Sequence, residues 1–280
     1  MGALLAAGID GCGVIRRGAI TTMTPIIGKT IQMAYRDQDL ETVGRGLPGN
    51  LLLIRGMCEE NPGDRQLWTF GTQLYYSYGY AFIEDDDPEE AILIYRQGLD
   101  LGLRALERGG WFLPERDIDT FCRGLRKARP EHGPLLFWTL ANWVNWIDLT
   151  QSDPASVAQL PYAEAALGRL LEIDPNYFLG MPHVMLGTLL ASKPAIAGGK
   201  PEEARRQFEA AFTVSKRRLL IFQVFYAQYY CRQVQDRDGF ISTLNEVLNA
   251  QADKEPNLRL LNEVAKRKAA RLMELKDEWF

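Results

Sequence analysis

The chain has 280 residues, of which 46% are hydrophobic and 24% charged, and its formal net charge is −4 at pH 7. This composition is typical of a soluble folded protein that is long enough to bury a substantial core. The only basic run is Lys266-Arg267-Lys268, which argues against nucleic acid as a partner. With two histidines and no Cys-x-x-Cys pair, the sequence predicts neither a metal site nor a cofactor.

The first residues, MGALLAAGIDGC, form a short apolar run that ends in a small residue and a cysteine. The run resembles the tail of a bacterial lipoprotein signal, which makes Cys12 the predicted site of lipid attachment. No Lys or Arg precedes the run, and Asp10 is unusual so close to the cysteine. An ordinary free cysteine is the alternative. We therefore divide the chain into a truncated signal-like segment, residues 1–12, and one helical domain, residues 13–280, with residues 13–20 as a short tether.

One helical pattern recurs along the chain. In GKPEEARRQFEAAF, Ala204, Phe208 and Ala211 share one face of a helix. In DPEEAILIYRQGLDL, Ala91, Tyr95 and Gly98 repeat this spacing. Related segments cover residues 50–57, 163–170 and 240–247, and most of them border Pro, Gly or Asp punctuation.

Most of these segments follow an aromatic-rich helix in which a large residue precedes a small one, as in Leu186-Gly187. We expect the small residue to receive a large side chain of the next helix. Such paired helices are typical of tetratricopeptide-like arrays. The predicted fold is all-α, a tetratricopeptide-like solenoid of helical hairpins bent on itself. A first capping helix is expected to begin at Thr24-Pro25, and a long helix after Leu258 is expected to end the stack.

The most unusual segment is FWTLANWVNWIDL, in which three tryptophans exceed what an ordinary core needs. Two asparagines lie among them and require partners if they are buried. One interpretation is the wall of a ligand cavity or channel. The other is an inner helix whose amides bond to neighbouring backbone. His183, on an apolar helix, is either a ligand contact or a hydrogen-bonded core histidine. The candidate cavity residues are Trp138, Asn142, Asn145, Trp146, His183 and Tyr226.

No pattern singles out catalysis. The sequence has no Gly-x-Ser-x-Gly motif, and Gly198-Gly199 is interpreted as a turn between helices. Asp85-Asp86-Asp87 lacks the later ligands of a calcium loop and is interpreted as an acidic turn. The chain is therefore predicted not to be an enzyme. A hydrolase or lyase that uses scattered carboxylates is the rival class.

Several segments together resemble one protein family. They are LETVGRGLPGNLLL, YSYGYAFIEDDDPEEAILIYRQGLDLGLRALE, FWTLANWVNWIDLTQSDP and LEIDPNYFLGMPHVMLGTLLASKPAIAGGKPEEARRQFEAAF. In the last segment, Asp174-Pro175, Gly180, His183, Gly187, Pro194 and Gly198-Gly199 follow the family's order. The family is the T component of tripartite ATP-independent periplasmic (TRAP) transporters, bacterial lipoproteins with a tetratricopeptide-like fold. The resemblance covers residues 12–280.

The resemblance implies a function that composition does not. It implies a periplasmic protein, anchored to the membrane by its N-terminal lipid, that partners the solute-binding P component. The protein would serve as a scaffold or conduit for ligand delivery, with a hydrophobic small ligand among the candidates. A homo-oligomer is one option for its assembly. The alternative is a general envelope scaffold for protein assembly.

Overall fold

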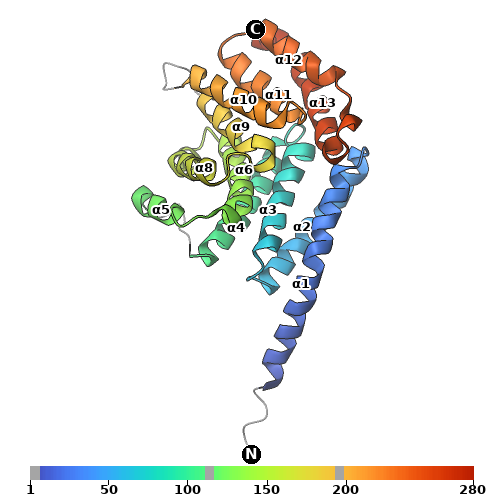
Figure 1. Cartoon of the computed structure of the whole chain (residues 1–280), viewed down its shortest axis with the longest axis vertical. Helices are drawn as coiled ribbons and strands as arrows, with labels where there is room; N and C mark the ends of the chain where they lie inside the picture. The colour runs from blue at the N-terminus through green and yellow to red at the C-terminus, as the bar shows by residue number, and fades with distance from the viewer. Residues whose placement is uncertain (1–6, 111–116, 193–198) are drawn as a thin grey trace, which may run out of the picture. The chain divides into compact units, whose positions relative to one another are not determined.

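A computed structural model describes residues 7–110, 117–192 and 199–280, with side chains from residue 17 onward (Figure 1). Every regular element in these ranges is a helix, which confirms the all-α prediction. The finer prediction of a solenoid bent on itself stays a prediction. The α-helices are α1 (Ala7–Tyr35), α2 (Leu40–Glu60), α3 (Arg65–Tyr78), α4 (Pro88–Arg108), α5 (Ile118–Leu125), α6 (Gly133–Leu149), α7 (Pro154–Val157), α8 (Leu160–Ile173), α9 (Tyr177–Ala191), α10 (Pro201–Ser215), α11 (Ile221–Phe225), α12 (Arg237–Asn249), α13 (Arg259–Glu274) and α14 (Lys276–Trp279).

Within the described residues, shorter helical segments join the α-helices. Two are π-helices, η1 (Gly79–Ile83) and η4 (Tyr226–Cys231), and each continues directly from an α-helix. Three are 3₁₀-helices, η2 (Pro130–His132), η5 (Ala252–Lys254) and η6 (Pro256–Leu258). Within the described ranges, no helix combines the length and the apolar character needed to cross a bilayer.

The chain divides into two compact units. Unit 1 comprises residues 1–33, 42–124 and 134–163, and unit 2 comprises residues 34–41, 125–133 and 164–280. The single domain expected over residues 13–280 stays a prediction. Each unit is described by itself.

In unit 1, α3 and α4 pack against each other as a hairpin. Asp64 caps α3 by accepting a hydrogen bond from the Leu67 amide. Asp87 caps α4 in the same way through the Glu90 amide, and Pro88 follows in the first turn, where its missing N–H costs nothing. The acidic run at residues 85–87 therefore ends in a helix cap.

Helices α1 and α2 approach this hairpin through glycines. A Cβ atom on Gly28 would lie 2.8 Å from the Phe70 ring, and one on Gly44 would lie 2.8 Å from the Phe82 ring. Such distances leave no room for a side chain, so the absence of Cβ brings the helices together. Thr24 adds a polar link from α1, because its hydroxyl donates to Asp64 at 2.6 Å.

The first helix is longer than expected. The sequence predicts a helix that begins at Thr24-Pro25, whereas α1 begins at Ala7 and passes through Pro25. Proline removes the hydrogen bond to the carbonyl of residue 21. Thr21 is exposed, so water can replace that partner. Residues 13–20, the predicted tether, are part of this helix.

In unit 2, the hairpin of α9 and α10 shows the predicted packing. Ala204, Phe208 and Ala211 are fully buried. A Cβ atom on Gly187 would lie 2.9 Å from the Phe208 ring, so the small residue of one helix receives the aromatic ring of the next. This confirms the explanation given for the recurring small–aromatic–small spacing.

The start of α9 contains an uncommon backbone turn. Phe178, Leu179 and Gly180 have φ values of 46°, 62° and 93°, so a short left-handed turn precedes the regular helix. Left-handed geometry costs roughly 1–2 kcal/mol for each residue with a Cβ. Gly180 avoids that cost and lies close to α10, since its Cβ would be 3.1 Å from Val214.

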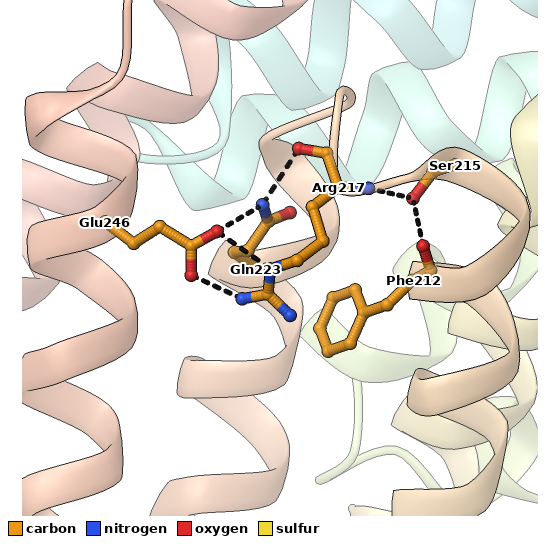
Figure 2. Close-up of polar contacts among 5 residues, drawn as sticks. All are labelled: Phe212, Ser215, Arg217, Gln223 and Glu246. Atoms are coloured by element: carbon orange, nitrogen blue, oxygen red, sulfur yellow. Dashed lines mark hydrogen bonds and ion pairs between the residues drawn. The ribbon is translucent and has the colours of Figure 1, made fainter.

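The turn after α10 is held by the polar contacts of Figure 2. Lys216 and Arg217 both have positive φ, at 52° and 57°. The Arg217 guanidinium donates two hydrogen bonds to Glu246 of α12, and it lies 4.2 Å from the centre of the Phe212 ring. The Gln223 amide donates to the Arg217 carbonyl at 3.1 Å and to Glu246 at 3.2 Å. These bonds fix a strained turn and join α11 to α12.

Replacing Gly187 by alanine tests the close approach of α9 and α10. Overpacking a core costs typically 1–3 kcal/mol, while alanine gains up to about 1 kcal/mol of helix propensity over glycine. We expect Gly187→Ala to lower the free energy of unfolding by about 1–2 kcal/mol in urea titrations. Gly168→Ala, in α8 of the same unit, meets no atom within 4 Å and is expected to raise it slightly. Equal effects of the two changes would contradict the packing described.

Candidate functional site

Helix α6 is the inner helix of unit 1, and it carries most of the candidate cavity residues. All side chains from Leu135 to Trp143 are buried, as expected for a helix that is apolar on every side. Trp138, Trp143 and Trp146 are 3%, 2% and 8% exposed. All three tryptophans are therefore part of the interior of unit 1, and their role as the wall of a ligand cavity stays a prediction.

Asn142 is held inside the contact between helices. Its side chain is fully buried, and its amide nitrogen donates to the carbonyl oxygens of Thr72, at 3.0 Å, and of Trp138, at 2.8 Å. Gly98 of α4 faces it, since a Cβ atom there would lie 2.2 Å from the Asn142 carbonyl oxygen. The Asn142 amide nitrogen is thus bonded to neighbouring backbone. This matches the second interpretation given for the segment, an inner helix whose amides bond to backbone.

Asn145 belongs to a polar cluster with Glu84 and Tyr95. The Tyr95 hydroxyl donates to a carboxylate oxygen of Glu84, and the Asn145 amide donates to the Tyr95 hydroxyl at 3.1 Å. The same amide lies 3.4 Å from Glu84. Tyr95 is fully buried, whereas Asn145 and Glu84 are partly exposed. The cluster therefore places a carboxylate and an amide at the partly exposed C-terminal part of α6.

Burial raises the pKa of Tyr95 well above its ordinary value of 10.0, and the negative charge of Glu84 raises it further. The phenol therefore stays protonated at neutral pH and acts as a donor. A protonated tyrosine between a carboxylate and an amide orients both neighbours, so this cluster is suited to holding polar groups in place.

Aromatic rings surround the cluster. Tyr76 stacks on Tyr80 at 5.6 Å between ring centres, and it lies 5.7 Å from Trp138 and 6.2 Å from Tyr95. Tyr80 belongs to η1, and Glu84 follows that segment directly. π-Helical turns are frequent at functional sites, because they re-aim side chains within an otherwise regular helix.

The other tryptophans of α6 have defined neighbours. The Trp143 indole donates to the Gln159 side chain at 2.9 Å, on the side away from the cluster. Trp146 lies under the guanidinium of Arg96, whose central carbon is 5.0 Å from the ring centre. The Arg96 guanidinium therefore covers one face of this indole in a cation–π contact.

The remaining candidates, His183 and Tyr226, belong to unit 2. His183 is partly exposed, and its Nδ1 is 2.7 Å from the Gln207 side-chain oxygen. Tyr226 opens the π-helix η4, stacks on Tyr230 at 4.9 Å and meets the Phe208 ring edge-on at 5.4 Å. Burial raises the pKa of the Tyr226 hydroxyl above its ordinary value. The structure thus places four candidates in α6 and two in unit 2.

Sequence reasoning missed Glu84, Tyr76 and the role of Tyr95. Tyr95 was recognised only as a packing residue, and Glu84 was not singled out. The tyrosine-rich run YYSYGY, followed by acidic residues, was the available signal. It does not reveal a π-helix, because the extra residue of such a turn depends on the neighbouring helices.

The described residues contain no group of three or more His, Cys, Asp or Glu side chains that could hold a metal ion. Cys58 and Cys231 are buried free thiols, and burial raises the pKa of each to about 12. At neutral pH both are protonated, so they are poor nucleophiles. The Cys12 side chain lies outside the described residues, although its backbone is part of α1.

Comparisons with known proteins identify a matching family and a similar protein. The model of a protein family described as "TRAP transporter T-component" matches residues 36–280. An uncharacterised protein of Treponema pallidum (strain Nichols) is 24% identical over 251 residues, which span 83% of this chain and 78% of that protein. The family match includes all of α2 to α14 and both π-helices.

Replacing Tyr95 by phenylalanine tests the polar cluster. Hydrogen bonds to charged groups contribute about 1.5–3 kcal/mol, so we expect Tyr95→Phe to lower the free energy of unfolding by roughly 2 kcal/mol at neutral pH. Because the folded state raises the pKa of Tyr95, its contribution is complete below pH 10 and declines as the pH rises above that value.

The difference between wild type and Tyr95→Phe should therefore shrink above pH 10, measured by chemical unfolding at several pH values. Tyr78→Phe, at the end of α3 in the same unit, is the control and should stay within about 0.5 kcal/mol of wild type. A constant difference across this pH range would contradict the protonated state described for Tyr95.

Proposed function

Because the chain belongs to the family of TRAP transporter T components, we propose that it is a periplasmic, lipid-anchored partner of the solute-binding P component. In this proposal the chain is a scaffold or conduit that helps to deliver ligand, and it performs no catalysis. The observation that carries the proposal is the family match over residues 36–280, which covers nearly all of the helical chain.

The packing supports a role in binding. Arrays of helical hairpins present extended surfaces to protein partners. The polar groups of α6 and its neighbours are held by hydrogen bonds, as in the cluster of Glu84, Tyr95 and Asn145. Fixed donors and acceptors beside aromatic rings are typical of sites that orient a ligand.

We assign the ligand contacts separately in each unit. In unit 1, Asn145 and Trp146 are the proposed ligand contacts. Trp138 and Asn142 are buried on the same helix and are proposed to hold the position of these two side chains. In unit 2, the partly exposed His183 and Tyr226 are the proposed contacts. The aromatic surroundings favour an apolar small molecule, and Glu84 with Asn145 favours one that also carries a hydrogen-bonding group.

A TRAP P component from the same organism provides the direct test. We expect the purified chain to bind that protein in isothermal titration calorimetry, and to change the rate at which it releases its solute. Asn145→Leu and His183→Leu should retain the complex but abolish the effect on release, because they remove proposed ligand contacts. Asn245→Leu, at an exposed position of α12, is the matched control and should behave as wild type.

Absence of a complex between the full-length acylated chain and the P component would contradict the proposed partnership. Capture of envelope assembly proteins in place of the P component would favour the alternative, a general scaffold. Turnover in a broad hydrolase screen that a single carboxylate substitution abolishes would overturn the non-catalytic assignment.

The lipid anchor has its own test. When the full-length gene is expressed in its native host, we expect the protein to take up labelled fatty acid and to sediment with membranes. Cys12→Ala should abolish labelling and release the protein to the soluble periplasmic fraction. The reason is that burial of an acyl chain contributes about 0.8 kcal/mol for each methylene group. Membrane retention of the variant, or lack of label on the wild type, would contradict acylation of Cys12.

A further inference from the structure

Helix α1 carries apolar side chains on its solvent side. Met23, Ile26 and Met33 are 43%, 62% and 53% exposed. Ile26 and Met33 are seven residues apart and therefore share one side of the helix. The opposite side is buried against unit 1 through Thr24 and Ile31, which are 3% and 9% exposed. The packing of α1 against the rest of unit 1 therefore does not use these exposed apolar side chains.

Helix α2 shows the same feature. Leu52 and Leu53 are 72% and 55% exposed, while Leu51 and Ile54 on either side of them are buried. Single exposed leucines are common on protein surfaces, but two adjacent ones leave a large apolar area in water. We call Met23, Ile26, Met33, Leu52 and Leu53 the outer apolar residues.

The charges on α1 from Gly11 onward, and the charge within one turn of Leu52 and Leu53 on α2, are positive. Between Gly11 and Tyr35 the sequence contains Arg16, Arg17 and Lys29 and no acidic residue. Lys29 is exposed one turn after Ile26, and Arg55 is exposed one turn after Leu52. Among the described residues, neither of these two cations takes part in an ion pair, unlike Arg104, which pairs with Glu59.

This combination favours one kind of partner. Exposed apolar side chains gain free energy on entering the acyl region of a bilayer, and nearby cations attract anionic headgroups. Contacts between protein side chains and lipid add to whatever attachment the acyl chains provide. The proposed acylation site, Cys12, lies on α1 itself.

We propose that the outer apolar residues of α1 and α2, with Lys29 and Arg55, rest on an anionic lipid surface. This inference rests on the proposed function in one respect. Lipid attachment at Cys12 would bring the exposed side of α1 close to the membrane. The inference adds a direct contact between protein side chains and lipid, which the acyl chain alone does not require.

The test uses the full chain with Cys12→Ser, so that no acyl chain contributes. We expect this protein to sediment with vesicles of phosphatidylglycerol and phosphatidylethanolamine, and to bind phosphatidylcholine vesicles roughly ten-fold more weakly. Two double variants, Ile26→Asn with Met33→Asn and Leu52→Asn with Leu53→Asn, should each weaken binding by about ten-fold or more. Lys29→Gln with Arg55→Gln should weaken it and reduce its dependence on salt.

Leu93→Asn is the matched control, because Leu93 is 63% exposed on α4 of the same unit. It should bind vesicles as well as the parent protein, and circular dichroism should show that all variants are folded. The proposal is overturned if neither apolar double variant weakens binding, or if Leu93→Asn weakens it equally.

Light scattering separates lipid from a second copy of the chain. If the double variants abolish self-association and leave vesicle binding unchanged, the outer apolar residues form an interface between copies, and the lipid proposal is wrong. The vesicle experiment can fail or succeed independently of the experiment that tests binding to the P component. A chain that binds vesicles but not the P component would contradict the proposed partnership and leave this inference intact.

Discussion

The close approach of helix backbones at small residues is the constraint on which both units depend. Gly98 allows α6 to pack directly against α4, and Asn142 fills the space that a side chain would take. The same contact brings Asn145 within reach of Tyr95. In unit 2, Gly187 gives the Phe208 ring its place against α9. Core packing and the position of the polar cluster thus have the same origin.

The two units also share a local arrangement. In each, an aromatic-rich helix ends in a π-helical segment, η1 or η4, and a pair of tyrosines stacks across it. The next helix then begins at an aspartate cap, Asp87 in unit 1 and Asp236 in unit 2. The proposed ligand contacts lie close to these segments in the sequence or in space. The repetition along the chain therefore includes the π-helical segments as well as the regular helices.

The regular part of this fold was accessible from the sequence, because its causes are local. The spacing of Ala204, Phe208 and Ala211 identified a buried face, and punctuation residues marked the helix ends. The contact between Glu84 and Tyr95 was not accessible, since it depends on where η1 ends relative to α4. Neither was the left-handed turn at Phe178, where the packing of α9 on α10 overrides the preference of residues with a Cβ. Among the candidates, Asn145 and Asn142 have similar sequence surroundings, and only tertiary packing distinguishes their roles.

The π-helical segments have a consequence for how such a protein evolves. A π-helical turn holds one residue more than an α-helical turn, so it can arise by inserting a single codon into a gene for a regular helix. The wider turn takes up the added residue, so the helix that follows keeps its register while the side chains within the turn are re-aimed. One such event between Tyr76 and Glu84 would bring a new side chain to face α4 and leave the upstream packing intact. New ligand contacts in this architecture are therefore accessible by changes in length as well as by substitution.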